Sequence, residues 1–189
     1  LAGLGIGGLA IALAAKDTLS NLFGSLTVIM DKPFKIGDWV VIGSKDIEGT
    51  IEEVGFRSTK VRTFYDSIIT VPNSVLTNIY IDNYGKRKYR RYSTKIRLAY
   101  DTQPETIEAF CEGIRQIILK HPLTRKDSFH VYLNDMNSSS LEILLYTFFY
   151  CPNWETELNE RHRLIIDILR LSKELNLSIS FPNQTLVIE

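Results

Sequence analysis

The stretch LAGLGIGGLAIALAAKDTLSNLFGSLTVIMDKPF, residues 1–34, indicates the class of this protein. Its first fifteen residues are only Leu, Ile, Ala and Gly, and its first charges are Lys16 and Asp17. A membrane-spanning helix needs about 20 apolar residues, and a run of about 10–14 indicates a buried helix, so this run lies between the two lengths. Because the sequence begins without Met, we expect a part of a longer protein, in which the apolar helix starts upstream.

Small residues dominate this apolar run. Such residues are favoured in membranes where helix backbones approach closely, so we expect copies of this helix to pack around an axis. Its packing and flexibility are assigned to six small residues: Gly3, Gly5, Gly7, Gly8, Ala10 and Ala12. Leu9 and Leu13 are four residues apart and share one helix face. In a ring of helices they would form two apolar constrictions that close a pore by dewetting.

A polar break and a second apolar stretch follow. The pattern predicts a kink at four polar residues: Lys16, Asp17, Ser20 and Asn21. After the kink we expect a second helix at the membrane surface. Its contacts with the interface are assigned to Phe23, Lys32, Phe34 and Lys35.

Three other interpretations compete for the apolar run. A signal peptide needs a basic start and a cleavage site, and the run has neither. Gly3, Gly5 and Gly8 match the GxGxxG pattern of dinucleotide-binding loops, but no strand precedes them. A buried helix of a soluble enzyme is the strongest competitor, and the polar break with a second apolar stretch after it weakens that interpretation.

Residues 35–84 predict a small β domain. Short β-rich runs at 39–42, 47, 50–54, 58–64 and 67–71 alternate with turn residues, and Tyr65-Asp66-Ser67 predicts a tight hairpin. Pro72-Asn73-Ser74 ends the run, because proline is excluded from central strands. Five short strands predict a small barrel or curled sheet.

Residues 85–182 predict an α/β domain. Strands at 92–98, 129–133, 141–149 and 178–181 alternate with helices at 104–119 and 153–175 in the β-α-β-β-α-β order of ferredoxin-like folds. We expect Asp101 or Thr102 to cap the first helix. The buried side of the second is assigned to Leu158, His162, Ile165, Ile166, Leu169 and Leu171. A strand at 185–188 ends the chain and pairs either within its domain or with neighbouring copies.

The composition excludes few classes of function, and it favours no particular catalytic or binding chemistry. Lys plus Arg and Asp plus Glu both total 22, so no net charge favours nucleic acid. Cys111 and Cys151 lack metal-ligand spacing and predict reduced thiols on a cytoplasmic side, with a single disulfide as the alternative. The three histidines are isolated, and no Walker loop or nucleophile motif is present. We therefore expect no enzyme, no cofactor and no metal.

One cluster of basic residues has three competing interpretations. Lys86, Arg87, Lys88, Arg90 and Arg91 surround Tyr89. Basic residues interleaved with aromatic residues are typical of RNA-binding segments. A solvated linker between two domains is favoured here, and a field that biases the selectivity of permeating ions is a third interpretation.

Three segments resemble one family. Residues 9–40, LAIALAAKDTLSNLFGSLTVIMDKPFKIGDWV, look like the pore helix and linker of the small-conductance mechanosensitive channel (MscS) family. IEGTIEEVGFRSTKVRTFYDSIITVPNS (47–74) and SFPNQTLVIE (180–189) resemble the same family, and the order of motifs is kept along the chain. The chain departs from the best-known member at Lys16-Asp17, where that member has Gln-Gly.

The resemblance implies an α+β membrane protein with four parts. These are a pore-lining helix with a kinked second half (1–34), an Sm-like β domain (35–84), a ferredoxin-like α/β domain (85–182) and a C-terminal barrel strand (183–189). It implies a homoheptameric channel in the inner (plasma) membrane, multi-pass, with residues after about 35 in the cytoplasm. The channel would open under membrane tension and release ions and small osmolytes during hypo-osmotic shock. Its partners would be other copies, lipids and permeating solutes, without nucleic acid.

An interpretation from another class stays open. The chain would then be a soluble oligomeric scaffold or an RNA-binding module, with residues 1–34 as a hydrophobic assembly helix and the basic cluster as its binding surface.

Overall fold

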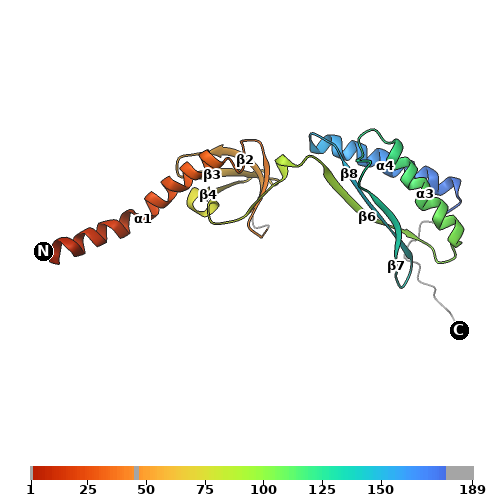
Figure 1. Ribbon diagram of the computed structural model, residues 1–189, viewed down its shortest axis with the longest axis horizontal. Coiled ribbons are helices and arrows are strands. Elements are labelled where there is room, and N and C mark those ends of the chain that lie inside the picture. Colours follow the sequence, from red (N-terminus) through yellow and green to blue (C-terminus); the bar gives the residue numbers. More distant parts are fainter. Residues whose placement is uncertain (1, 45–46, 178–189) are drawn as a thin grey trace. The chain divides into compact units, whose positions relative to one another are not determined.

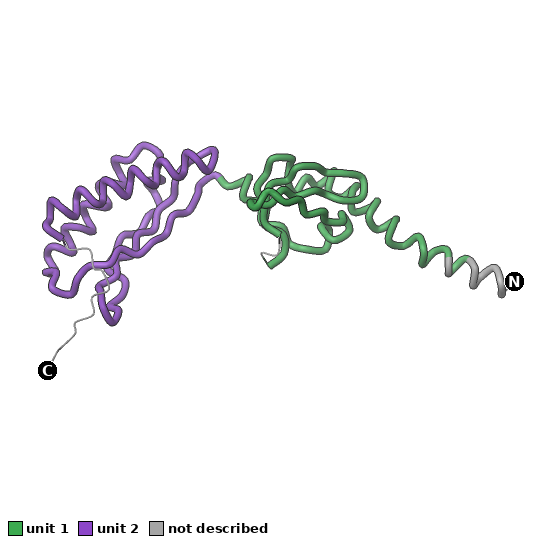
Figure 2. The backbone as a smooth tube through the Cα atoms, turned by 180° about the vertical axis from the view of Figure 1, so that it is seen from behind, with its two compact units in different colours: residues 1–87 green, residues 88–189 purple. Residues whose placement is uncertain are grey.

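The structure of the protein is a computed structural model that describes residues 2–44 and 47–177, and only the backbone of residues 2–7 and 10. It forms two compact units, residues 1–87 and residues 88–189, shown in different colours in Figure 2. The strands expected at 178–181 and 185–188, and with them the C-terminal barrel strand, lie outside the described residues.

Unit 1 consists of a long helix followed by a small β domain (Figure 1). Its elements are α1 (Ala2–Asp31), β1 (Trp39–Ile42), β2 (Ile47–Val54), β3 (Ser58–Thr63), β4 (Ile68–Pro72), α2 (Asn73–Leu76), β5 (Ile81–Asn83) and the 3-10 turn η1 (Tyr84–Lys86). The five strands form one antiparallel sheet in the order β4-β3-β2-β1-β5. The hairpin predicted between β3 and β4 is confirmed, since Asp66 has a φ of 64° and the Thr63 amide donates to the Ser67 carbonyl at 2.9 Å.

One apolar core holds unit 1 together. Its buried side chains come from α1 and the loop after it, from β1 to β4 and from α2: Val28, Phe34, Val40, Ile42, Ile51, Val61, Val71 and Leu76. Because Val28 belongs to this core, the last turns of α1 are part of the β domain's packing rather than a separate layer. Burial of such apolar area is the main favourable term in folding.

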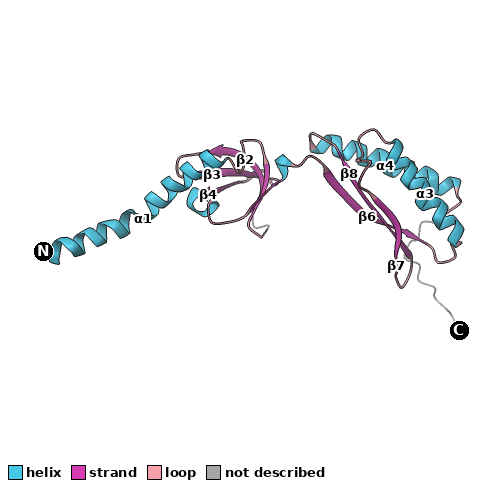
Figure 3. Cartoon of the chain, viewed as in Figure 1, coloured by secondary structure: helices cyan, strands magenta, loops and turns pink. Residues whose placement is uncertain are grey.

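The described part of unit 2, residues 88–177, is a three-stranded antiparallel sheet covered on one face by two helices (Figure 3). Its elements are β6 (Arg90–Leu98), α3 (Pro104–Lys120), β7 (His130–Met136), β8 (Leu141–Phe149) and α4 (Trp154–Glu174), with sheet order β6-β8-β7. Every second residue of β8 faces the helices, where Ile143, Leu145 and Phe149 pack against Phe110 and Ile114 of α3. The described part of unit 2 follows the predicted β-α-β-β-α order.

The structure corrects two expectations in unit 1 and two in unit 2. α1 is one continuous helix from Ala2 to Asp31, and the kink assigned to its polar residues stays a prediction. Two polar side chains after the apolar run bond to the backbone of the helix itself: the Asn21 amide donates to the Asp17 carbonyl at 2.8 Å, and the Ser25 hydroxyl to the Asn21 carbonyl at 2.8 Å. In unit 1, β5 was not predicted from the sequence. The β-rich runs predicted separately at 47 and at 50–54 form one continuous strand, β2.

The helices of unit 2 supply the other two corrections. α3 is preceded by Gln103, which makes no side-chain cap bond, while the Thr102 hydroxyl donates to the Ala99 carbonyl at 2.7 Å. The buried face of α4 carries Glu157, Leu164, Ile168 and Ser172. Three residues that were assigned to the buried side, Leu158, Ile165 and Leu169, are exposed, as is His162.

Candidate functional site

The first two thirds of α1 expose apolar side chains. Leu9 and Leu13, the predicted constriction, lie one turn apart on one helix face, and each is 63% exposed. Gly8 has open space around the position that a Cβ would take, and Ala12 is exposed. Gly3, Gly5, Gly7 and Ala10 belong to the helix, but their side-chain surroundings lie outside the described residues.

The last third of α1 is fixed to the β domain through one face. Gly24, Ser25 and Val28 are its buried residues, at the spacing of one helix stripe. A Cβ on Gly24 would lie 2.7 Å from the backbone carbon of Asn73, so the two backbones approach as closely as glycine allows. α1 therefore contacts α2 directly, backbone against backbone.

Asn73 is the centre of this junction. Its side chain is completely buried, at 0% exposure. The Asn73 amide nitrogen donates to the Ser25 hydroxyl at 2.9 Å and to the Gly55 carbonyl at 2.9 Å. Its amide oxygen accepts from the Thr59 hydroxyl at 2.8 Å. One side chain thus joins α1, the β2–β3 turn and β3.

Two further bonds strengthen the junction. The Ser25 hydroxyl contacts the Phe56 carbonyl, and the Ser74 amide donates to the Asn21 side-chain oxygen at 3.3 Å. Asn21 therefore bonds both to its own helix and to α2. The sequence indicated Asn21 as a kink residue and Asn73 as the end of a strand, and it gave no sign that the two belong to one polar cluster.

Most of the predicted kink and interface residues are exposed, but Phe34 is buried. Lys16, Asp17 and Ser20 are exposed along the continuous helix. Among the predicted interface residues, Phe23 is 63% exposed, and Lys32 and Lys35 are exposed as well. Phe34 is only 4% exposed and packs in the core of unit 1, so its assignment to the membrane interface is wrong.

Three cations of the basic cluster at 86–91 are held by contacts inside their own units. The Lys86 ammonium donates to the Lys32 carbonyl at 3.1 Å, just beyond the end of α1, and the Arg87 guanidinium lies 4.2 Å from the Tyr84 ring centre and 4.9 Å from that of Trp39. Arg90 pairs with the buried Glu157 at 3.1 Å. These three cations therefore serve the packing of their own units, whereas Lys88 and Arg91 are exposed.

Titratable groups in unit 2 are involved in packing as well. His121 is not isolated: its Nε2 lies 3.2 Å from Oε2 of Glu160, and burial lowers the pKa of its imidazole, an effect that Glu160 partly opposes. Asp127 accepts two bonds from the Arg125 guanidinium, which lowers the pKa of its carboxyl to about 2. Cys111 and Cys151 are free and buried, as predicted, and burial raises the pKa of both thiols.

Among residues 2–44 and 47–177, no group of His, Cys, Asp and Glu side chains is placed to hold a metal ion. Within the same described ranges, none of the helices combines the length and the apolar character that crossing a bilayer requires.

The β domain and its junction with α1 match a known family. The family model described as "Mechanosensitive ion channel, beta-domain" matches residues 17–86, which include the last half of α1 and the whole sheet of unit 1. The chain belongs to the MscS family. Its MscS-type β domain begins inside α1, in agreement with the packing of Ser25 and Val28 against the sheet.

Relatives extend the match beyond the β domain. The low conductance mechanosensitive channel YnaI of Escherichia coli is 35% identical over 186 residues, which are 98% of this chain and 54% of that protein. The small-conductance mechanosensitive channel MscMJ of Methanocaldococcus jannaschii is 36% identical over 189 residues, 100% of this chain and 53% of its own length. The chain thus spans about half the length of these MscS relatives.

A solved MscS structure agrees with the whole fold. The closed-state structure of Helicobacter pylori MscS superposes with a TM-score of 0.80 at 27% identity, and the match covers 100% of this chain and 72% of the other. The MscS assignment therefore holds for unit 2 as well as for unit 1.

Proposed function

We propose that the chain is the pore helix and cytoplasmic part of a mechanosensitive channel subunit, which opens under membrane tension and releases ions and small osmolytes during hypo-osmotic shock. Relatives that carry the name of mechanosensitive channels support this function. In this proposal residues 1–34 belong to the membrane part, 35–84 are the Sm-like β domain, 85–182 the ferredoxin-like domain and 183–189 a barrel strand.

The proposal rests on the difference between the two parts of α1. Its first two thirds expose Leu9, Ile11 and Leu13 to solvent, which is costly for a helix that stands alone in water. Its last third is bonded into the β domain through Ser25 and Asn73. Such a helix needs apolar partners at one end and a rigid anchor at the other, as a pore helix above a cytoplasmic domain would.

Copies of the chain would supply those partners. We propose a homoheptamer in the inner (plasma) membrane, multi-pass through upstream segments, with residues after about 35 in the cytoplasm and lipids around Phe23, Lys32 and Lys35. Small residues at 3, 5, 7, 8, 10 and 12 would let the helices pack closely and bend. Polar residues at 16–21 would provide the kink.

Gating then follows from the apolar face of α1. In the closed ring Leu9 and Leu13 would form two layers too narrow and too apolar to hold water. Tension stabilises the state that occupies more membrane area, so the helices move apart and the layers separate. Ions and small osmolytes follow the water through the opening.

Patch-clamp recording of the full-length protein in liposomes under stepped suction tests this function. We expect stretch-activated currents, with Leu13→Ser opening at lower tension because a polar ring holds water more easily. Leu19→Ser serves as a control, since Leu19 is exposed on α1 below the predicted constriction. A silent wild-type protein in verified liposomes would refute the channel, and an unchanged or raised threshold in Leu13→Ser would refute the assigned gate.

A further inference from the structure

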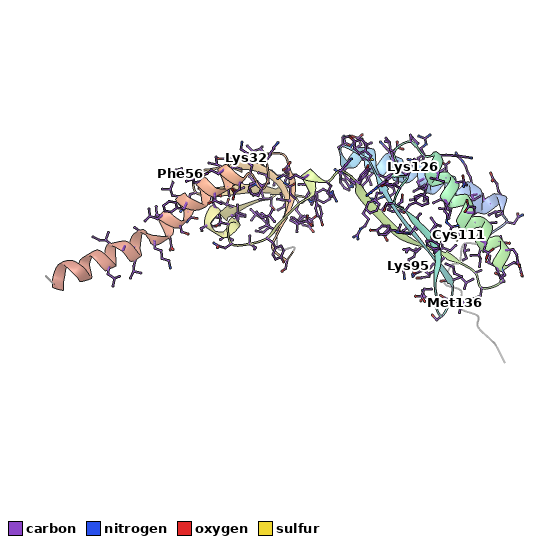
Figure 4. The ribbon with its side chains drawn as sticks, viewed as in Figure 1. Lys32, Phe56, Lys95, Cys111, Lys126 and Met136 are labelled. Carbon is purple, nitrogen blue, oxygen red and sulfur yellow. The ribbon has the colours of Figure 1, made fainter. Side chains whose placement is uncertain are left out.

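Unit 2 contains a pocket that the proposed function does not use. It has a volume of about 480 Å³, and three segments that are far apart in the sequence line it: Lys88 with Tyr89, residues 122–127 of the loop between α3 and β7, and Tyr150 at the end of β8. Figure 4 shows Lys126, one of the loop residues, beside the C-terminal end of α3. We call this site the loop pocket.

Positive charge predominates in the lining of the loop pocket. Lys88 comes from the basic cluster of the sequence, and the fold adds Arg125 and Lys126 from the loop. Asp127 is the one carboxylate among the described lining residues, so three cations stand against one anion. A concave site lined mainly by one sign of charge raises the local concentration of ions of the opposite sign. The loop pocket therefore attracts anions.

Arg125 is held in a fixed position in this pocket. Its backbone amide donates to the Phe148 carbonyl at 2.8 Å. Its Nε and Nη2 donate to the two carboxylate oxygens of Asp127, each at 2.8 Å. The guanidinium carbon lies 4.9 Å from the centre of the Tyr89 ring. In the part of the chain that the structure describes, Nη1 of Arg125 has no hydrogen-bond partner, so its N–H groups remain for an oxyanion.

Lys126 neutralises the end of α3 beside the pocket. The last carbonyls of a helix carry partial negative charge, which would repel an anion. The Lys126 ammonium donates to the Ile118 carbonyl at 2.6 Å and to the His121 carbonyl. It also donates to the Thr124 hydroxyl at 2.6 Å. These acceptors occupy all the N–H groups of the ammonium, so Lys126 contributes its charge and leaves ligand binding to other donors.

Lys88 is the second donor with free N–H groups. It is exposed, and its ammonium lies 5.5 Å from the centre of the Tyr89 ring that Arg125 also contacts. Among residues 2–44 and 47–177 no carboxylate forms an ion pair with it. The rings of Tyr89 and Tyr150 meet edge to face at 6.0 Å and add their hydroxyl groups to the wall of the pocket.

We propose that the loop pocket binds a small anion that carries a phosphate monoester group. The phosphate oxygens accept from the Lys88 ammonium and from Nη1 of Arg125, and phosphate is bound most strongly by such charged donors. The two cations converge on one tyrosine ring instead of following a stripe, which favours a small ligand over a strand of nucleic acid. The same donors recognise the phosphate of a soluble molecule and that of a lipid headgroup. The site does not depend on the proposed channel activity.

Equilibrium dialysis of radiolabelled inorganic phosphate with the full-length protein in detergent tests the site. We expect saturable binding at physiological salt, and an affinity about tenfold lower or less in Lys88→Gln, because one charged donor is lost. Lys88→Arg keeps the charge and the donors and should bind as wild type does. Lys173→Gln is the matched control, since it removes the same charge from an exposed lysine in the last turn of α4, outside the pocket lining.

Competition distinguishes the two sources of the phosphate. Displacement of the labelled phosphate by glycerol phosphate would identify a soluble ligand. Displacement by micelles with phosphatidic acid, and neither by glycerol phosphate nor by micelles with phosphatidylcholine, would identify a lipid headgroup.

Three results would overturn the proposal. The first is a wild-type protein without saturable phosphate binding, and the second is an equal affinity of wild type and Lys88→Gln. The third is an equal loss in Lys88→Gln and Lys173→Gln, which would assign the binding to the general charge of the protein. Because no current is measured, each result holds whether or not the protein is a channel.

Discussion

The Asn73 side-chain amide donates a 2.9 Å hydrogen bond to the Ser25 hydroxyl, across 48 positions of sequence. This bond lies in a cluster with the half-buried Gly55 and the buried Thr59, and it ties the pore-helix candidate α1 to the sheet of the β domain. Buried polar groups are expensive when they lose a partner, so the cluster holds α1 in one position rather than several.

Asn73→Ala should destabilise unit 1 by about 2–4 kcal/mol, because it leaves the Gly55 carbonyl and the Thr59 hydroxyl without their partner. Thr59→Val removes one of the bonds and should cost less, about 1 kcal/mol. Thermal unfolding of the purified protein measures both. Asn134→Ala, an exposed position of β7, is the control. Equal melting temperatures for Asn73→Ala and Asn134→Ala would contradict the role of the cluster.

Replacement of two glycines of α1 by alanine should change the stability of the protein in opposite directions. Gly24→Ala places a Cβ 2.7 Å from the Asn73 backbone, so α1 must move away from α2, at a cost of about 1–3 kcal/mol. Gly8→Ala meets open space and should stabilise the helix by up to about 1 kcal/mol. Calorimetry of the two variants beside wild type gives the comparison. A Gly24→Ala protein as stable as wild type would mean that the close approach is not required.

Local features allowed most strands to be predicted, and β5 shows why one was not. β1 and β8 are short runs rich in apolar, β-branched and aromatic residues, bounded by turn residues, and these are properties of neighbouring positions. β5 has only three residues, and it becomes a strand by pairing with β1, where Val40 lies opposite Asn83. The composition of neither segment predicts this pairing.

The buried face of α4 and the Asn73 cluster escaped prediction for the same reason. α4 carries two stripes with apolar residues, and the stripe that faces the core includes Glu157, which periodicity would place in water. Arg90 and Arg161 pair with Glu157 and make its burial possible. Choosing the correct face requires knowledge of residues that other parts of the chain bring to it.

Adjacent arginines should therefore differ sharply in their effect on stability. Arg90 is 13% exposed, pairs with Glu157 and donates to the Cys151 carbonyl at 3.3 Å, whereas Arg91 is exposed. We expect Arg90→Leu to cost about 2–3 kcal/mol, since Arg161 still pairs with the buried carboxylate, and Arg91→Leu to change stability by less than about 0.5 kcal/mol. Chemical denaturation monitored by tryptophan fluorescence measures both. Similar unfolding free energies for the two variants would contradict this difference and would favour the interpretation of the basic cluster as a solvated linker.

His121 should make the protein less stable in mild acid. Its folded-state pKa is lowered from the ordinary value of 6.5, first by burial and then by Lys126 and Arg163, so below about pH 6.5 the unfolded chain binds a proton that the folded chain does not. Stability contributed by the neutral imidazole is therefore complete above pH 6.5 and is lost as the pH falls toward the folded-state pKa. Each unit of difference between the two pKa values corresponds to about 1.4 kcal/mol.

His121→Asn removes this titration and keeps an acceptor near the Leu123 amide, which bonds to Nδ1 of His121 at 3.3 Å. We expect its melting temperature to fall less than that of wild type between pH 7.5 and pH 5.5. His130→Asn changes an exposed histidine of β7 and should follow the wild-type curve. Parallel curves for wild type and His121→Asn would show that the acid sensitivity of unit 2 comes from other groups, with Glu160 then the first to replace, by Gln, because it is the carboxylate that faces the imidazole at 3.2 Å.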